Sequence, residues 1–421
     1  MNLLVKKSSL EGSIEIPGSK SHTIRAVVIA SLANGKSRII SPLDSGDTRS
    51  AVVACRALGA EIEIGKEWIV RGFGGYPQLQ ASKIDLGNSG TSLSLTTSVA
   101  ALQEEEVVFD GDDSLRTRPI QPLLDALNNL GASAYSVGEN GCCPIRVRGR
   151  MRGGKTKVSG ISSQYLSSLL ISTPLLEEDT EIHVIDLNEK PYAGMTLAWL
   201  KEQQIDYQRE GWETFRVKGR QCYHHFDKRV PGDFSSATFP LCAAVITDSQ
   251  VLLKGLDMND TQGDKEVITM LNSMGANIQV KEEGILVTSS ELTGCELDLN
   301  STPDALPALA VVGCYAKGKT ILKNVAQARI KETDRIKVMR AELSKMGAEI
   351  EEMEDGLIIR QSKLKGTRVR GYHDHRVVMA LSLAGMIAQG ETEIDSAESI
   401  EITFPGYVEK MCQLSALMKF I

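Results

Sequence analysis

Hydrophobic and polar positions follow a pattern that occurs six times along this chain. In each copy a polar or charged cluster precedes an apolar, alanine-rich run, which leads through a turn into a β-branched stretch. The apolar run predicts a buried helix with a capped start, and the β-branched stretch predicts a strand. The six helices are expected to begin at Ser21, Asn88, Ser162, Ser235, Pro303 and His373.

A second pattern alternates with the first. Amphipathic helical segments end at a glycine and lead into a strand at 56–64, 129–137, 272–280 and 344–353, and a degenerate copy occupies 199–208. Glycine suits this position because many helices end at a residue with positive φ. The combined period of roughly 65–75 residues is too long for a solenoid unit and favours a small α/β module repeated within domains.

One segment, 220–236, interrupts the repeats with basic residues, a Pro-Gly pair and an aspartate, and it divides them three and three. A similar Pro-Gly pair stands at 17–18, directly before the first polar cluster. We therefore expect an N-terminal lobe over 18–230 and a C-terminal lobe formed by 1–17 together with 231–421. The chain would cross between the lobes twice.

Composition narrows the function classes. The formal net charge of −7 and the lack of interleaved basic and aromatic residues argue against nucleic-acid binding. No apolar run is long enough to span a membrane, and no secretory signal is evident, so we expect a cytoplasmic protein. The eight cysteines have neither disulfide-framework nor zinc-site spacing, which predicts reduced, mostly buried thiols.

The starts of the predicted buried helices are candidate anion sites. The first turn of a helix presents unpaired N–H groups and the positive end of the backbone dipole, which favour phosphate or carboxylate. Ordinary capping explains any single serine-rich start equally well. Basic residues near these starts favour the anion-binding interpretation; the residues concerned are Lys20, Ser21 and Arg25, then Asn88 to Thr91, then Ser162 to Gln164.

Further charged residues lie near other element ends. Arg118, Lys331, Arg335 and Arg376 are basic, and the four-residue spacing of Lys331 and Arg335 predicts that one helical face carries both. Taken alone, this segment is also typical of a solvated, charged helix. Asp304 precedes a wholly apolar helix, where aspartate is an ordinary N-cap or first-turn residue and secondarily a proton-transfer candidate.

The chain resembles the 5-enolpyruvylshikimate-3-phosphate synthase family of enolpyruvyl transferases nearly end to end. The matching segments are PGSKSHTIRA, GNSGTS, RTRPIQPLLDAL, SSQYLSSLL, KPYAGMT, VPGDFSSATF, STPDALPALA, RIKETDRI, DHRVVMALSLAG and TFPGYVE. The resemblance implies a two-domain, inside-out α/β barrel of six βαβαββ-like units, three per domain, with substrates held in the cleft between the domains.

The family reaction transfers the enolpyruvyl group of phosphoenolpyruvate to the 5-hydroxyl of shikimate 3-phosphate and releases phosphate. The resemblance implies catalytic roles for Asp304, Glu332 and Lys20. It implies that shikimate 3-phosphate is bound by Lys20, Ser21, Arg25, Ser162, Ser163, Gln164, Tyr192, Asp304, Gln327 and Lys331. It implies that phosphoenolpyruvate is bound by Lys20, Asn88, Gly90, Arg118, Gln164, Arg335, His375 and Arg376. Neither a metal nor an organic cofactor is expected, and we expect a monomer.

Four positions depart from the family pattern. Ser94 and Ile402 stand where an arginine and a lysine are common, and Glu189 and Gln327 replace a common serine and asparagine. Glu189 would put a carboxylate near the acceptor phosphate unless it turns away or pairs with Lys190. Three alternatives therefore stay open: a paralogue acting on another cyclic acceptor, a non-catalytic binding homologue, and a transferase of the UDP-N-acetylglucosamine type. The absence of cysteine between 56 and 141 counts against the last.

Overall fold

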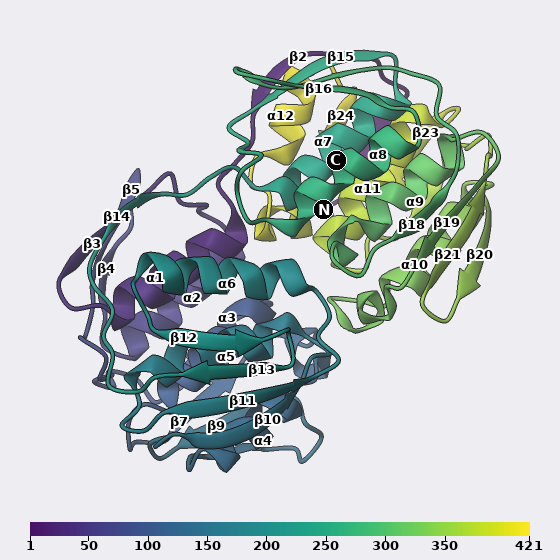
Figure 1. The fold of residues 1–421 in the computed structure, drawn as a ribbon. Helices are drawn as coiled ribbons and strands as arrows, with labels where there is room; N and C mark the ends of the chain where they lie inside the picture. The colour runs from purple at the N-terminus through teal and green to yellow at the C-terminus, as the bar shows by residue number, and fades with distance from the viewer. The chain divides into compact units, whose positions relative to one another are not determined.

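The computed structural model describes residues 1–421 and divides the chain into two compact units. The N-terminal unit is Gly18–Val230, and the C-terminal unit combines Met1–Pro17 with Pro231–Ile421. Figure 1 labels the elements of both units. No helix is both long enough and apolar enough to cross a membrane.

Six four-stranded sheets, three in each unit, share one strand arrangement. In every sheet the first strand pairs with the second in parallel, and the second with the third and the third with the fourth are antiparallel pairs. The same α/β unit therefore recurs six times, three times in each unit, as the resemblance implies.

The strands of the N-terminal unit form three sheets: β14(Asp227–Arg229), β3(Lys36–Ile40), β5(Glu67–Arg71), β4(Glu61–Glu63); β6(Lys83–Asp85), β7(Val107–Asp110), β9(Ile145–Arg148), β8(Ser133–Ser136); and β10(Gly154–Ser159), β11(Thr180–Ile185), β13(Thr214–Val217), β12(Tyr207–Glu210). Those of the C-terminal unit are β22(Arg368–Val369), β23(Glu391–Ile394), β1(Leu3–Lys6), β24(Met418–Phe420); β2(Leu10–Glu15), β15(Ser249–Lys254), β17(Gly284–Thr288), β16(Asn277–Lys281); and β18(Glu296–Asp298), β19(Lys319–Lys323), β21(Gly356–Arg360), β20(Glu349–Met353).

Three helices form the centre of each unit. They are α1(Lys20–Leu32), α3(Gly90–Ala100) and α5(Ser163–Ser172) in the N-terminal unit, and α7(Phe234–Ile246), α9(Leu306–Tyr315) and α11(His375–Ile387) in the C-terminal unit. Nearly every residue of these helices is buried, as expected for helices that are apolar on all sides. They correspond to the six predicted apolar runs.

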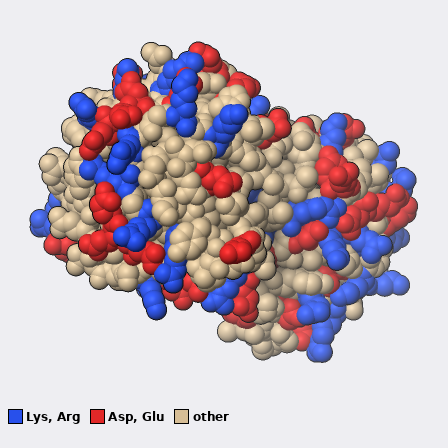
Figure 2. All heavy atoms as spheres, turned by 90° about the horizontal axis from the view of Figure 1, so that it is seen from below, with Lys and Arg blue, Asp and Glu red and all other residues tan.

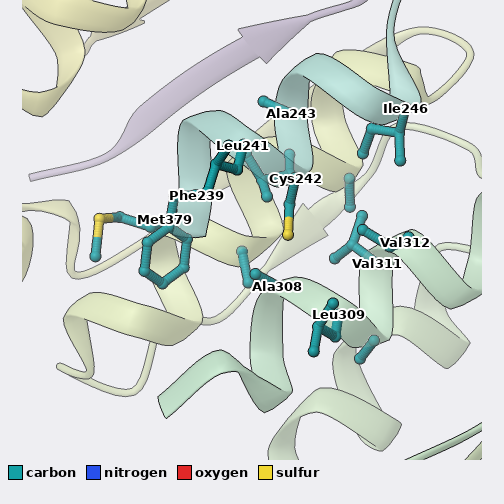
Figure 3. Close-up of a cluster of buried hydrophobic side chains, with 14 of the residues drawn as sticks. Phe239, Leu241, Cys242, Ala243, Ile246, Ala308, Leu309, Val311, Val312 and Met379 are labelled. Carbon is teal, nitrogen blue, oxygen red and sulfur yellow. The ribbon is translucent and has the colours of Figure 1, made fainter. Parts of the chain in front are cut away.

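Side chains of the central helices pack tightly on one another in the C-terminal unit. Figure 3 shows this cluster. The labelled residues are Phe239, Leu241, Cys242, Ala243 and Ile246 of α7, Ala308, Leu309, Val311 and Val312 of α9, and Met379 of α11. Alanine and other small residues let these helices approach closely, and the sheets cover the outside of the bundle (Figure 1).

The second helix of each module is amphipathic and shorter or less buried. These helices are α2(Gly46–Ala57), α4(Gln121–Asn129), α6(Lys190–Glu202), α8(Glu266–Ser273), α10(Arg335–Lys345) and α12(Tyr407–Gln413). Four end at a glycine with φ between +94° and +112°, namely Gly59, Gly131, Gly275 and Gly347. In the degenerate copy after α6 the equivalent residue is Gln204, with φ of +58°. The predicted helix-to-strand turns are therefore present in these five modules.

The chain passes between the units at two Pro-Gly pairs. Strand β2 pairs in the C-terminal unit and precedes α1, whereas β14 pairs in the N-terminal unit and precedes α7. Both glycines allow close backbone approach: a Cβ at Gly18 would lie 2.5 Å from Ser41 O, and one at Gly232 would lie 2.4 Å from Gly255 O. These positions therefore exclude larger residues.

The face drawn in Figure 2 carries lysine and arginine interspersed with aspartate and glutamate, and neither sign dominates it. All eight cysteines are free. Four are buried, two are partly exposed and two, Cys222 and Cys412, are exposed, so only half of the thiols lie in the core. The prediction of mostly buried thiols was too broad, because the other four cysteines lie in loops or, for Cys412, on an exposed side of α12.

Candidate active site

Lys20 begins α1, which is capped by the side chain of Ser19. Its ammonium Nζ lies 2.9 Å from Asp47 Oδ2, and the two side chains are 14% and 6% exposed. Asp47 belongs to the first turn of α2, and its carbonyl oxygen accepts a hydrogen bond from Ser92 Oγ of α3, at 3.0 Å. The contact with Asp47 therefore joins the starts of three helices around the predicted catalytic lysine.

Arg25 is buried one turn further along α1. Its guanidinium donates to Thr196 Oγ1 at 2.8 Å, to the Tyr192 carbonyl at 3.0 Å, to the Ser21 carbonyl at 3.1 Å and to Ser167 Oγ at 3.3 Å. Burial lowers the pKa of Arg25 to about 10, and the charge of Tyr192 opposes that shift. Because all four partners are neutral, the charge on this buried guanidinium is suited to an anionic ligand.

The start of α5 is linked to the start of α3. Ser162 caps α5 by accepting from Gln164 N at 3.3 Å. Gln164 Nε2 donates to Thr91 Oγ1, and Gln164 Oε1 accepts from Ser94 Oγ, both at 3.1 Å. Ser94, which stands where the family commonly has arginine, is thus a buried bridge between two helices.

Ser163 contacts Glu189, one of the four residues that depart from the family pattern. Its hydroxyl donates to Glu189 Oε2 at 3.0 Å, and both side chains are buried. This contact is separate from the two arrangements considered for Glu189, turning away or pairing with Lys190, which stay predictions. Ser163 and Glu189 are 26 positions apart in the sequence, and the fold brings them within hydrogen-bonding distance.

Arg118 lies beside the start of α3. Its Nη2 donates to Asn88 Oδ1 at 2.6 Å and to Ser114 Oγ at 3.2 Å. A Cβ at Gly90 would lie 3.1 Å from Arg118 Nη1, which is closer than most such contacts. Glycine at this position therefore leaves space for the guanidinium.

The C-terminal unit holds a buried cluster of ionised groups around Arg335, the first residue of α10. Its guanidinium donates from Nε to Asp374 Oδ2 at 2.8 Å, from Nη1 to Asp304 Oδ1 at 2.6 Å and from Nη2 to Glu332 Oε2 at 2.5 Å. Arg376 Nη2 lies 3.0 Å from Asp304 Oδ2. Two arginines and three carboxylates are therefore in direct contact.

Arg335 is fully buried, and burial by itself lowers the pKa of its guanidinium. Asp374, Glu332 and Asp304 outweigh that effect and raise the pKa above its ordinary value. The interpretation of this segment as a solvated helix is therefore wrong for Arg335. A permanent charge at this position holds three acidic side chains together.

Lys331 and Arg335 do not share a helical face, contrary to the prediction from their spacing. Lys331 follows the 3₁₀ helix η5(Ala326–Ile330), and α10 begins only at Arg335. The helix does not extend back to Lys331, because Asp334 is the N-cap of α10: its Oδ1 accepts from Lys337 N at 3.0 Å. The error came from extending a four-residue spacing across a helix boundary.

Four further residues considered in the sequence lie in helices of the C-terminal unit. Asp304 is in the first turn of η4(Pro303–Ala305), which leads into α9. Gln327 is buried in η5 and donates to the Asn300 carbonyl at 3.0 Å. His375 is buried at the first position of α11, and Ile402 ends η6(Ala397–Ile402). The predicted start of α11 at His373 is two residues early, because Asp374 is the cap.

Several of the helix starts singled out in the sequence are in contact within each unit. In the N-terminal unit, side-chain contacts connect α1, α2, α3, α5 and α6, and in the C-terminal unit they connect η4, α10 and α11. Sequence reasoning missed Asp47 and treated Asp374 only as part of a capped start. The signal for both is an aspartate at a helix start, which is too common to single them out.

No group of three histidine, cysteine, aspartate or glutamate side chains is arranged to hold a metal ion. A surface pocket of about 330 Å³ lies over β10, β11, β12 and β13, and none of the predicted site residues lines it. Its charged side chains pair with one another, as in Lys155–Glu181 and Lys218–Asp179. The candidate site is therefore defined by the polar clusters at the helix starts.

Comparison with known proteins gives one consistent family. The family model described as EPSP synthase (3-phosphoshikimate 1-carboxyvinyltransferase) matches residues 4–411. The chain is 52% identical over 417 residues to the 3-phosphoshikimate 1-carboxyvinyltransferase of Acetivibrio thermocellus, covering 99% of both chains. It is 45% identical over 424 residues to that of Methanocaldococcus jannaschii, covering 98% of both. A solved structure of EPSP synthase from Acinetobacter baumannii has a TM-score of 0.84 at 27% identity, over 99% of each chain.

Proposed function

Because this chain belongs to the EPSP synthase family, we propose that it transfers the enolpyruvyl group of phosphoenolpyruvate to the 5-hydroxyl of shikimate 3-phosphate, releasing phosphate. This step serves the shikimate pathway, which leads to chorismate and the aromatic amino acids. The observation that carries the proposal is the cluster in which Asp304 and Glu332 both contact Arg335. It supplies two carboxylates for proton transfer beside guanidinium groups that can attract an anion.

In the proposed reaction, the methylene carbon of phosphoenolpyruvate gains a proton while the acceptor oxygen bonds to the neighbouring carbon and loses its proton. The resulting tetrahedral intermediate then expels phosphate, which keeps the electrons of the broken C–O bond, and the methyl group gives up a proton. Asp304 is proposed as the base for the hydroxyl. Glu332 is proposed as the acid and base at carbon, with Lys20 as a participant.

The binding roles expected from the sequence stay proposals. Shikimate 3-phosphate is assigned to Lys20, Ser21, Arg25, Ser162, Ser163, Gln164, Tyr192, Asp304, Gln327 and Lys331, and phosphoenolpyruvate to Lys20, Asn88, Gly90, Arg118, Gln164, Arg335, His375 and Arg376. Two features support them: Arg25 donates to four neutral groups, and Arg118 donates to the side chains of Asn88 and Ser114 beside the start of α3. Such cations are suited to the carboxylates and phosphates of both substrates.

The test is phosphate release measured with phosphoenolpyruvate and shikimate 3-phosphate together. Reactions that lack either substrate, and a reaction in which unphosphorylated shikimate replaces the acceptor, are the controls. We expect rapid release only with the complete pair. Binding of both ligands without phosphate release would instead support the non-catalytic homologue, and faster release with another cyclic acid would support the paralogue.

We further propose that the enzyme is a cytoplasmic monomer, as expected from the sequence. Sedimentation equilibrium in the presence and absence of both substrates measures the oligomeric state directly. A mass of two chains in either condition contradicts the proposal.

A further inference from the structure

Glu189 has an unusual backbone and an unusual environment. It is the N-cap residue of α6 and has left-handed dihedral angles, φ 53° and ψ 39°. A non-glycine residue rarely adopts this conformation, and a glutamate is rarely buried unless it is paired. Its side chain is nevertheless only 3% exposed. The fold therefore holds this carboxylate in a buried position despite the left-handed backbone.

The carboxylate is held at the start of a second helix. Ser163, the first residue of α5, is 1% exposed, and its hydroxyl donates to Glu189 Oε2 at 3.0 Å. Glu189 is therefore next to the first turns of both α5 and α6. Both helix dipoles favour negative charge at this place, so an internal carboxylate occupies surroundings that would suit a ligand phosphate.

Ser163 cannot serve both anions at once. A serine hydroxyl has one proton to donate, and carboxylate and phosphate oxygens are both acceptors. While the Ser163 hydroxyl donates to Glu189, that hydroxyl has no proton left for a phosphate oxygen. A phosphate close enough to take that bond would also meet the like charge of the carboxylate.

We propose that Glu189 is a specificity-determining residue of the acceptor site, whose carboxylate competes with the acceptor's phosphate for the Ser163 hydroxyl. This inference rests on the proposed function, because it takes Ser163 to be part of the shikimate 3-phosphate site. Glu189 keeps the affinity for the phosphate group low. It thereby narrows the difference in affinity between phosphorylated and unphosphorylated acceptors.

The test is a double-mutant cycle on the full-length protein with Glu189→Ser, Ser163→Ala and the double variant. Dissociation constants for shikimate 3-phosphate and for unphosphorylated shikimate are measured by calorimetry, and kcat and KM by phosphate release. Glu189→Ser should tighten shikimate 3-phosphate binding about tenfold, on the scale of one hydrogen bond to a charged group. The dissociation constant for shikimate and the KM for phosphoenolpyruvate should change less than about twofold.

The most informative result is how the effect of Ser163→Ala on shikimate 3-phosphate binding differs between the parent protein and the Glu189→Ser variant. In the parent protein, where Glu189 already takes the hydroxyl proton, Ser163→Ala should weaken shikimate 3-phosphate binding by a clearly smaller factor than in the Glu189→Ser background. In the Glu189→Ser background the same change should weaken binding about tenfold. Glu189→Gln keeps the side-chain shape without the charge, so it should tighten binding by a smaller factor and it covers the case in which Glu189→Ser does not fold.

Asp186→Asn is the matched control. Asp186 is exposed, lies three residues before Glu189 and also has positive φ, so the variant removes an equal charge from the same loop. It should leave both dissociation constants unchanged. An equal effect of Asp186→Asn and Glu189→Gln would overturn the proposal, because the loop's net charge would then explain the result.

Two further outcomes separate the inference from the function on which it rests. If the parent enzyme turns over shikimate 3-phosphate but Glu189→Ser binds it no more tightly, the role of Glu189 is overturned and the proposed function stands. If neither the parent nor any variant releases phosphate from the substrate pair, the proposed function is overturned and this inference with it.

Discussion

Replacing Asp374 with asparagine should strongly destabilise the C-terminal unit. Asp374 is fully buried. Its carboxylate accepts from Arg335, and it caps α11 by accepting from Arg376 N at 2.9 Å and Val377 N at 3.4 Å. Asparagine is as good a helix cap as aspartate, so the cap is retained. What is lost is the negative charge beside a buried guanidinium.

The size of the loss follows from the contacts. Arg335 donates to Asp374 from Nε at 2.8 Å and from Nη2 at 3.2 Å. With the asparagine oxygen kept at the cap, an NH₂ group replaces Oδ2, so the bond from Nε is lost, and the bond from Nη2 to Oδ1 remains but its acceptor is no longer charged. Hydrogen bonds to charged groups contribute about 1.5–3 kcal/mol each, and Asp304 and Glu332 still compensate the guanidinium, so we expect a total loss of about 3 kcal/mol. For a domain of this size that lowers Tm by about 6–12 °C.

Urea unfolding and differential scanning calorimetry measure the effect, and Asp334→Asn is the control. Asp334 also caps a helix and also pairs with an arginine, Arg329, at 2.8 Å, but its side chain is 30% exposed. A pair that solvent reaches contributes about 0–1 kcal/mol, so the control should lose no more than that. Equal losses in the two variants would refute the reasoning, because burial would then not decide the strength of the pair.

Three other outcomes are expected. Asp304→Ala should lower kcat by about 10²–10⁴-fold while shikimate 3-phosphate binding stays largely intact, and a fully active variant in the phosphate-release assay removes Asp304 from the role of base. Gln204→Gly should raise Tm by about 1–4 °C in calorimetry, because it relieves a left-handed residue at a net gain of up to about 1 kcal/mol, and a lower Tm contradicts this. At pH 8, Ellman's reagent should modify the exposed Cys222 and Cys412 first, whereas burial raises the pKa of Cys55 to about 12 and keeps it a thiol. Rapid modification of Cys55 in the folded protein would contradict its burial.

The repeat architecture could be predicted because its signals are local. An apolar run without a polar face indicates a central helix, and a glycine after an amphipathic segment indicates a helix end. Both patterns depend on residues within a few positions of one another. The exceptions were also local: Gln204 takes the positive φ that glycine has elsewhere, and Asp334 starts a helix inside a segment whose charge spacing indicated a continuous one.

The partners of the site residues could not be predicted in the same way. Lys20 and Asp47 are 27 positions apart, Ser163 and Glu189 are 26 apart, and Arg335 and Asp374 are 39 apart. No periodicity relates such pairs, because they meet only when the starts of different helices are packed side by side. For this reason the solvated-helix interpretation of Arg335 was wrong, and the contact between Ser163 and Glu189 was not foreseen.

The sequence by itself determined which residue types stand at each helix start, and with them the candidate anion sites. Only the tertiary structure decided whether a given charge is compensated: Arg25 has neutral partners, whereas Arg335 is surrounded by carboxylates. The physical reason is that the energy of a charge depends on burial and on the atoms a few ångströms away. Those atoms come from distant parts of the chain.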